Sequence, residues 1–428
     1  MLDIKFIREN LEVCKKAAKN KNRDVDWDGL LALDDKRREL IGKIETLRAQ
    51  RNVLGTGDRG QGTEATRKKG KEIKQELKKL EDELRSVEER FGLLMLTVPN
   101  VPDKSVPVGK DSSGNKTVKT WGKIPKFSAK GGPASGWDFP AKDHIALAKS
   151  LDLIDFDRGA KVGGFRAYFL KNEAAQMEFA VLFYTFQKLI KKGYTPLIAP
   201  SLVKDFTLFG NGQFPWGREE VYHLEKDDLY LAGTAEVPVT AYFSGEVLEE
   251  KDLPKKFVAF SPCFRREAGS YGKDTKGAYR VHQFSKIEQV IISTNDMSTS
   301  FTLHEELLAN AEEVLQDLEL PYRVLLMCTG DMGEPQVKKY DIETWMPGRN
   351  GYGETMSNSV MGDFQARRLK IRYKTKDGKT LFCHTLNNTA IASPRILIAI
   401  LENYQQKDGS IRVPKVLQSF IGKDVIRK

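Results

Sequence analysis

The feature that most limits how this chain can fold is a leucine repeat near its start. Leu33, Leu40, Leu47 and Leu54 recur every seven residues, with Ile44 filling one intermediate position. After a glycine-rich break at 55–62, a second apolar series alternates strictly by four and three residues: Ile73, Leu77, Leu80, Leu84, Val87, Phe91 and Leu94. Such spacing places an apolar seam on each of two helices, and the glycines predict that the chain cannot stay helical between them.

The two helices are expected to form an antiparallel hairpin, because a short connection makes neighbouring helices run in opposite directions and close on each other. The second helix should span roughly 45 Å, longer than a small domain is wide, so the hairpin should protrude. One interpretation is an oligomerisation coiled coil, and the other is an arm that grips a large ligand. Basic residues crowd the part of the second helix nearest the tip, and charge of one sign suits a phosphate backbone. They are Arg67, Lys68, Lys69, Lys71, Lys74, Lys78 and Lys79.

Composition agrees with a protein of two domains that has a polyanionic partner. The chain has 428 residues, a formal net charge of +10 and a pI of about 9.1. Its cysteines form no C-x-x-C pair, so we expect free thiols in a reducing compartment and no zinc site. The N-terminus has no apolar leader, and no apolar run approaches the length of a membrane span. We therefore expect a cytoplasmic protein without membrane contact.

Prolines at 99 and 102 predict the end of the second helix, since proline removes a donor and clashes with the preceding turn. The residues that follow are rich in Gly, Ser, Pro and Lys and are typical of a linker. The expected organisation is an N-terminal domain with the hairpin at 1–110, a linker at 111–140 and a larger domain at 141–428.

The larger domain mixes helical and strand-like patterns without regular alternation. Helical periodicity appears near 174–192, 298–318 and 394–404, and strand-like runs appear at 257–260, 290–292, 323–326 and 369–373. This irregular order predicts an α+β fold in which helices flank an antiparallel sheet.

Nucleotide binding in this chain has to rest on side chains, because it contains no P-loop and no G-x-G-x-x-G after a predicted strand. Residues 264–270 and 280–288 predict two antiparallel strands joined by a long loop. Charged residues stand two apart on both strands, so one face should be lined with charge. These residues are Arg265, Glu267, Lys286 and Glu288, beside Phe284.

This charged strand pair resembles a known family. F-R-x-E-A-G-S at 264–270, followed by R-x-H-Q-F-x-K-x-E at 280–288, is similar to motif 2 of class II aminoacyl-tRNA synthetases in its seryl form. Further similar stretches are T-A-E at 234–236, E-x-x-S-N at 354–358 with D-F-Q-A-R-R at 363–368, N-N-T at 387–389 with Arg395 (motif 3), and 193–200 (motif 1). Nearly the whole chain takes part in this resemblance.

The resemblance implies an enzyme that activates L-serine with ATP and then transfers the serine to the 3′ end of tRNA(Ser), with tRNA(Sec) left open as a second acceptor. It implies Arg265 on the α-phosphate and the serine carboxylate, and Arg280 and Arg395 as the other catalytic cations, on the β- and γ-phosphates. Glu267 should accept from the adenine amino group while Phe284 stacks on the ring. The full implied ATP set is Arg265, Arg266, Glu267, Arg280, Phe284, Glu354, Thr355, Met356, Ser357 and Arg395, with Glu354 and Ser357 also holding Mg²⁺.

The implied serine site contains carboxylates for the ammonium group and polar groups for the hydroxyl. Its residues are Thr234, Ala235, Glu236, Arg265, Glu288, Asn387 and Thr389. A pocket that hydrogen-bonds a hydroxyl rejects alanine strongly, because its own polar groups would be left unpaired. No protein nucleophile is implied, and His282 is expected to be structural.

The family also implies partners: tRNA(Ser) through the 30–95 arm and the motif 2 loop, and a homodimer through motif 1. Three features depart from its pattern. Lys273 and Lys276 stand in the loop where arginine is common, Asn388 and Ala390 replace glycines of motif 3, and 128–139 resembles an insertion. Two alternatives stay open: another amino-acid ligase on this fold, and an inactive homologue that binds RNA.

Overall fold

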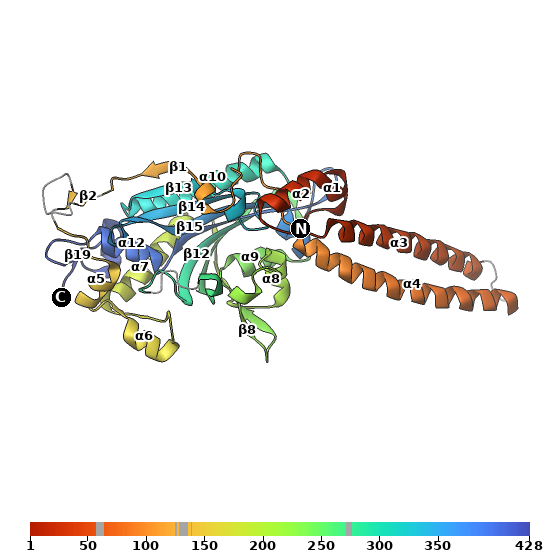
Figure 1. Cartoon of the computed structure of the whole chain (residues 1–428), viewed down its shortest axis with the longest axis horizontal. Helices are drawn as coiled ribbons and strands as arrows, with labels where there is room; N and C mark the ends of the chain where they lie inside the picture. Colours follow the sequence, from red (N-terminus) through yellow and green to blue (C-terminus); the bar gives the residue numbers. More distant parts are fainter. Residues whose placement is uncertain (57–63, 125, 128–135, 138, 271–275) are drawn as a thin grey trace. The chain divides into compact units, whose positions relative to one another are not determined.

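The computed structural model of the chain forms two compact units, residues 1–99 and 100–428 (Figure 1). The structure describes residues 1–56, 64–124, 126–127, 136–137, 139–270 and 276–428. Lys273 and most of the expected insertion at 128–139 lie outside the described residues. No helix in these ranges combines the length and apolar character that a membrane crossing requires.

The first unit contains the predicted helical hairpin. Two short helices, α1 (Ile4–Glu9) and α2 (Leu11–Asn20), precede the long helices α3 (Trp27–Thr56) and α4 (Glu64–Thr97). The seam between α3 and α4 is apolar, as the heptads predict, and contains Ile44, Leu47, Leu54, Ile73, Leu77, Leu80 and Leu84. Ion pairs edge the seam, with Arg48 Nη2 2.7 Å from Glu81 Oε1. The basic residues of α4 named above are all exposed.

A buried carboxylate joins α1 to α3 within this unit. Asp34 is fully buried and accepts from Arg8 Nε at 2.6 Å and from Arg37 Nη2 at 3.0 Å. Burial raises the pKa of Asp34, but hydrogen bonds from these two arginines lower it further, so the net shift is downward.

The second unit is built on one large sheet, which confirms the predicted α+β class. Its strand order is β1-β13-β14-β15-β18-β12-β11-β6, antiparallel throughout except for the β11–β6 pair. In that order the bounds are Lys116–Trp121, Tyr322–Leu326, Lys338–Met346, Gly351–Gly362, His384–Ala392, Gln283–Ser293, Lys255–Phe264 and Thr195–Ile198.

Three helices supply most of the apolar core against this sheet: α7 (Asn172–Lys191), α10 (Met297–Asp317) and α12 (Arg395–Asn403). Ile287 and Ile291 of β12 and Leu386 of β18 belong to that core. Because side chains alternate along a strand, the residues between them turn to the opposite face of the sheet. That opposite face holds the site described below.

Shorter elements complete the second unit. They are α5 (His144–Ser150), α6 (Phe156–Gly163), α8 (Asp205–Asn211), α9 (Glu236–Thr240), α11 (Phe364–Leu369), α13 (Gln418–Ile421), β2 (Lys126–Phe127), β3 (Gly136–Trp137), β4 (Ile154–Asp155), β5 (Phe169–Leu170), β7 (Leu202–Val203), β8 (Tyr222–Leu224), β9 (Leu229–Leu231), β10 (Val247–Glu249), β16 (Arg372–Lys374), β17 (Thr380–Phe382), β19 (Ile411–Arg412) and β20 (Val425–Ile426).

Two segments differ from their sequence patterns. Residues 116–121, expected within a linker, form the edge strand β1; five of its six side chains are exposed, so it carries no apolar alternation that could reveal it. The strand-like run at 369–373 is wrong at its start, because Leu369 ends α11 and Lys370 caps that helix with a φ of 57°. Leu369 is buried as the last residue of α11, so it is apolar because that helix packs into a core cluster and not because it lies in a strand.

Candidate active site

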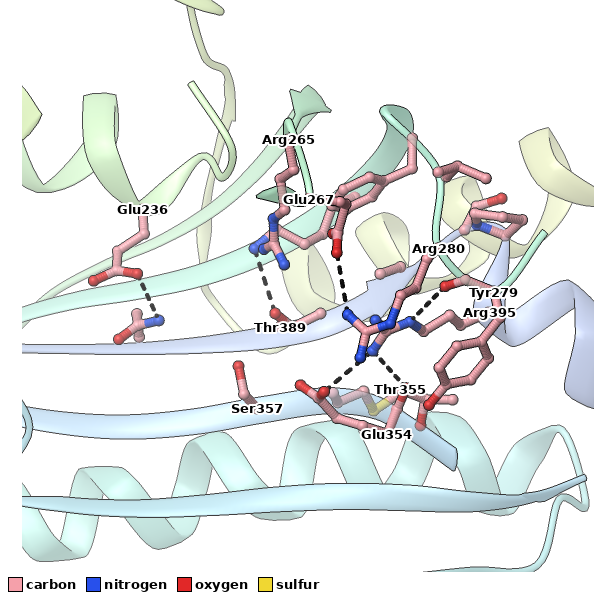
Figure 2. Close-up of a pocket in the computed structure, with 18 of the residues that line it drawn as sticks. Glu236, Arg265, Glu267, Tyr279, Arg280, Glu354, Thr355, Ser357, Thr389 and Arg395 are labelled. Atoms are coloured by element: carbon pink, nitrogen blue, oxygen red, sulfur yellow. Dashed lines mark hydrogen bonds and ion pairs between the residues drawn. The ribbon is translucent and has the colours of Figure 1, made fainter. Parts of the chain in front are cut away.

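A cavity of about 240 Å³ opens where the ends of β11, β12, β15 and β18 meet the start of α12 (Figure 2). Segments that are far apart in the sequence converge on it. The predicted site residues that line it are Glu236, Arg265, Glu267, Arg280, Phe284, Glu354, Thr355, Met356, Ser357, Asn387, Thr389 and Arg395.

Four other predicted residues do not line the cavity. Ala235 is fully buried in a small apolar cluster, and Arg266 is exposed with its guanidinium 6.0 Å from the centre of the Tyr222 ring. Thr234 and Glu288 are buried directly behind lining residues and reach them through hydrogen bonds. Ala235 can therefore act only through its backbone or its packing.

Backbone and side-chain acceptors orient each of the three predicted catalytic arginines. Arg265 Nε donates to the Gly233 carbonyl at 3.2 Å, and its guanidinium lies 5.2 Å from the centre of the Phe284 ring. Arg280 Nη1 donates to Glu267 Oε2 at 3.1 Å. Glu267 has a φ of 53°, a left-handed backbone conformation that is uncommon outside glycine.

Arg395, the first residue of α12, is held by two elements. Its Nε donates to the Tyr279 carbonyl at 3.1 Å, and its Nη1 donates to the carbonyl of Glu354 at 3.0 Å and to Oε2 of that residue at 3.2 Å (Figure 2). Held in this way, its guanidinium is presented to the cavity with little freedom to reorient.

Glu354 is half-buried and remains ionised. Burial raises the pKa of its carboxyl, but the positive charges of Arg395, Lys339 and Arg265 outweigh burial, and the net shift is downward. With the Ser357 hydroxyl on the same strand, this carboxylate supplies hard oxygen donors of the kind that Mg²⁺ prefers. Among the described residues no three His, Cys, Asp or Glu side chains cluster as a metal site.

The other end of the cavity is anionic. Asn387 Nδ2 donates to Glu236 Oε2 and to Glu288 Oε1, both at 3.1 Å. Its Oδ1 is buried and accepts no hydrogen bond from the residues that the structure describes, so an acceptor is left for a ligand. Burial, together with the nearby charge of Glu288, raises the pKa of Glu236 to about 7.

A buried lysine decides which carboxylate is open to a ligand. Lys286 Nζ donates to Thr234 Oγ1 at 2.7 Å and to Thr389 Oγ1 at 3.4 Å, and it forms an ion pair with Glu288. The Thr389 hydroxyl donates to Glu288 Oε2 at 3.2 Å. Glu288 is therefore compensated from within the protein, while Glu236 lines the cavity.

Comparisons with known proteins agree with this geometry. Residues 1–102 match the family described as "Seryl-tRNA synthetase N-terminal domain", and residues 220–404 match "tRNA synthetase class II core domain (G, H, P, S and T)". Serine–tRNA ligase of Deinococcus radiodurans is 45% identical, with 99% of this chain and 98% of the relative covered. That of Treponema denticola is 44% identical with both chains fully covered.

The chain belongs to the seryl-tRNA synthetase family. Solved members share its fold: the seryl-tRNA synthetase of Pyrococcus horikoshii complexed with ATP gives a TM-score of 0.92 at 40% identity, covering 100% of this chain and 99% of that one. The cytoplasmic serine–tRNA ligase of Naegleria fowleri with AMP gives 0.87 at 32%, again covering 100% and 99%. The predicted family, fold class and enzyme class are confirmed, and the comparisons give no support to an inactive homologue.

The structure also shows where the motif 3 departures lie. Asn388 is fully buried and accepts from Gln289 Nε2 at 2.7 Å, and Ala390 is buried in the main core. Neither side chain lines the cavity, and β18 runs as a strand through both positions. The missing glycines therefore leave the lining unchanged. His282 Nδ1 donates to the Arg265 carbonyl at 2.9 Å, a contact in keeping with the structural role expected of it.

Sequence reasoning missed the lining residues Lys339 and Tyr279, and it placed Lys286 on the charged face without assigning it to the site. Lys339 lies 3.0 Å from Asp341, whose pKa burial raises, and Asp341 stands opposite Ser357 in the β14–β15 ladder. Lys339 and Asp341 are two residues apart, the same spacing of opposite charges that drew attention to motif 2. That signal could have found them.

We predict that Lys286→Met destabilises the second unit by about 3–5 kcal/mol, because it leaves Glu288 buried and unpaired. Lys379→Met is the matched control, since the Lys379–Asp377 pair is exposed and its loss should cost under about 1 kcal/mol. Urea unfolding measures both. Adding Glu288→Gln to Lys286→Met should restore part of the lost stability. Equal stability of Lys286→Met and Lys379→Met would contradict the buried pairing.

Proposed function

We propose that this chain joins ATP and L-serine into seryl-adenylate and pyrophosphate, and then transfers serine to the 3′ end of tRNA(Ser). One observation carries the proposal: a single cavity has Arg280 and Arg395 at one end, Glu236 with Asn387 at the other, and Arg265 between them (Figure 2). This distribution of charge complements a triphosphate at one end and an amino acid's ammonium group at the other. Family membership supports the same reading, since a relative in the family was solved with ATP.

ATP is proposed to lie at the cationic end. Phe284 would stack on the adenine and Glu267 would accept from its amino group, while Arg280 and Arg395 take the β- and γ-phosphates. Thr355 and Met356 line the cavity beside Glu354 and complete this pocket. Glu354 and Ser357 would hold Mg²⁺, which when bound neutralises charge on the phosphates.

Serine is proposed to lie at the anionic end with its carboxylate on Arg265. The ammonium would pair with Glu236, since Lys286 already compensates Glu288. Asn387 Oδ1 and Thr389 remain for polar contacts, and Thr234 and Glu288 shape this subsite from behind. Alanine would leave those polar groups unpaired and would be rejected.

The chemistry then needs positioning and charge stabilisation, without a protein nucleophile. A serine carboxylate oxygen attacks the α-phosphorus, and the bond to the bridging oxygen breaks so that pyrophosphate leaves with the electron pair. Arg265, fixed by Gly233 and Phe284, faces the charge that grows at the α-phosphate. A ribose hydroxyl of the terminal tRNA adenosine next attacks the adenylate carbonyl, and AMP leaves.

The tRNA is proposed to be gripped by the 30–95 hairpin, with its acceptor end meeting the motif 2 loop. The exposed basic residues of α4 suit phosphates.

A homodimer through motif 1 is also proposed, because Ile198 on the edge strand β6 and Phe179 on α7 are 82% and 77% exposed. A cytoplasmic location is also proposed, and the four free, buried cysteines fit a reducing compartment.

The direct test is amino-acid-dependent exchange of pyrophosphate into ATP. We expect exchange with serine and little with alanine or threonine. Arg265→Ala should lower the rate at least about 100-fold, because it removes charge stabilisation at the reacting phosphate. Arg266→Ala is the matched control, since that neighbouring side chain lies outside the cavity. Exchange with a different amino acid, or none, would refute the function, and normal exchange in Arg265→Ala would refute its role.

Serine binding should depend on pH through Glu236. Its pKa of about 7 means that the free site is largely protonated at pH 6 and ionised at pH 8, and only the ionised form pairs with an ammonium group. At saturating ATP, the KM for serine should therefore be about tenfold higher at pH 6 than at pH 8. Glu236→Gln should raise the KM and abolish its pH dependence; an unchanged pH profile in this variant would exclude Glu236 as the ammonium partner.

The hairpin can be shortened without disturbing its base. Deleting residues 49–80 and joining Arg48 to Glu81 through a short glycine linker removes the exposed basic residues, and these two side chains are already 2.7 Å apart. We expect unchanged pyrophosphate exchange, a KM for tRNA raised at least about tenfold as phosphate contacts are lost, and an intact dimer by sedimentation. A monomer with normal tRNA charging would favour the oligomerisation coiled coil instead.

A further inference from the structure

A buried histidine outside the cavity lining, His144, contacts the backbone at the ATP end of the site. His144 begins α5, and its Nδ1 lies 3.1 Å from Glu402 Oε1, which also accepts from the His144 backbone N–H at 2.9 Å. The other oxygen of Glu402 accepts from the Gly348 N–H at 2.8 Å. Both Glu402 oxygens thus accept from the protein, and the side chain is 3% exposed.

The tautomer of His144 follows from its two neighbours. Its Nε2 lies 3.2 Å from the backbone nitrogen of Ala278, which can only donate, so Nε2 must carry the lone pair. Nδ1 then carries the proton and donates to Glu402. The three groups form a chain in which Glu402 fixes His144 and His144 fixes Ala278, like the outer partners that orient a ligating histidine.

Residues 277–280, the segment that His144 holds, supply the cationic end of the cavity. Ala278 is fully buried, the Tyr279 carbonyl accepts from Arg395, and Arg280 follows directly. Gly277 has a φ of 74°, and a Cβ there would stand 2.2 Å from His144 Nε2, so the close approach needs glycine at this position.

Helix α12 therefore holds this segment twice. Arg395 at its first residue bonds the Tyr279 carbonyl, and Glu402 in its last turn acts on Ala278 through His144. Two anchors on one rigid helix define both the position and the direction of the backbone that leads into Arg280.

We propose that His144 is a positioning residue for the nucleotide: held in its Nδ1–H tautomer by Glu402, it fixes residues 277–280 so that Arg280 and Arg395 meet the β- and γ-phosphates together. This inference rests on the proposed function. It assigns His144 a role in ATP binding and none in serine binding, because Glu236, Asn387 and Arg265 make no contact with it.

Two substitutions separate positioning from simple packing. In His144→Gln the longer side chain can still offer an acceptor where Nε2 stood, whereas His144→Asn can keep a donor toward Glu402 but cannot reach Ala278. In serine-dependent pyrophosphate exchange we expect His144→Asn to raise the KM for ATP about tenfold and leave the KM for serine within about twofold, with His144→Gln near wild type. Equal ATP KM values for the two variants, or a matching rise in the serine KM, would overturn the proposal.

Two further variants keep the test decisive. If His144→Asn does not fold, Glu402→Gln replaces it, because an amide cannot accept at both oxygen positions. This variant should raise the ATP KM and leave the serine KM unchanged. An unchanged ATP KM would overturn the proposed link from Glu402 through His144 to Ala278. In His144→Asn/Arg280→Ala the rise in the ATP KM should be smaller than the product of the two single rises, since His144 acts partly through Arg280; a full product would overturn the coupling. Absence of serine-dependent pyrophosphate exchange in the wild-type protein would instead refute the proposed function.

Discussion

The anionic end of the cavity, where serine is proposed to bind, depends on one buried ion pair, that of Lys286 with Glu288. Both residues stand on the central strand β12, where an unpaired carboxylate would cost about 3–5 kcal/mol, and the ladder to β18 places Thr389 directly opposite Glu288. The pair has two consequences. It removes Glu288 as a free anion, and it tempers the pKa of Glu236, which burial and the charge of Glu288 raise to about 7 while the charge of Lys286 lowers it. Glu236, the carboxylate that a ligand can reach, therefore has a pKa close to neutral pH, and an incoming ammonium group would favour its ionised form.

Charge in the cavity is ordered along its length. From Glu236 the lining passes to Arg265 and then to Arg280 and Arg395 (Figure 2), so an anion is followed by three arginines, of which the last two are paired with the lining carboxylates Glu267 and Glu354. An amino acid beside a triphosphate carries the opposite order, an ammonium, then a carboxylate, then phosphates. Arg265 stands where the two anionic groups of the ligands would meet, and it is fixed by the carbonyl of Gly233 and the ring of Phe284. Preorganisation of this kind needs no rearrangement when charge develops.

The heptads predicted the apolar seam of the hairpin, and the irregular order of helical and strand-like patterns predicted the α+β class. Charges spaced two apart pointed to Arg265 and Glu267, while most of the dozen predicted residues that line the cavity came from the resemblance to class II synthetases. Other features depend on tertiary partners. Strand β1 exists only because β13 offers it an edge, and Lys286 was visible merely as part of a charged face until Thr234 and Thr389 closed around it. The tautomer of His144 is equally hidden, since it is set by Glu402, 258 residues away in the sequence. Sequence patterns show which side chains share a face of a helix or strand, whereas tertiary contacts determine the role of each side chain.

Departures from a family pattern matter only on the face of the strand where the chemistry lies. On β18, Asn387 and Thr389 face the cavity, while Asn388 and Ala390 face the core, because neighbours alternate. Asn388 is a partner for Gln289 in the network that joins the sheet to α10, through Asn310. The side chains at these two positions therefore contribute packing and hydrogen bonds behind the sheet and take no part in the cavity lining. Alternate residues of one strand therefore serve two separate purposes: those on one face stabilise the core, and those on the other face form the site.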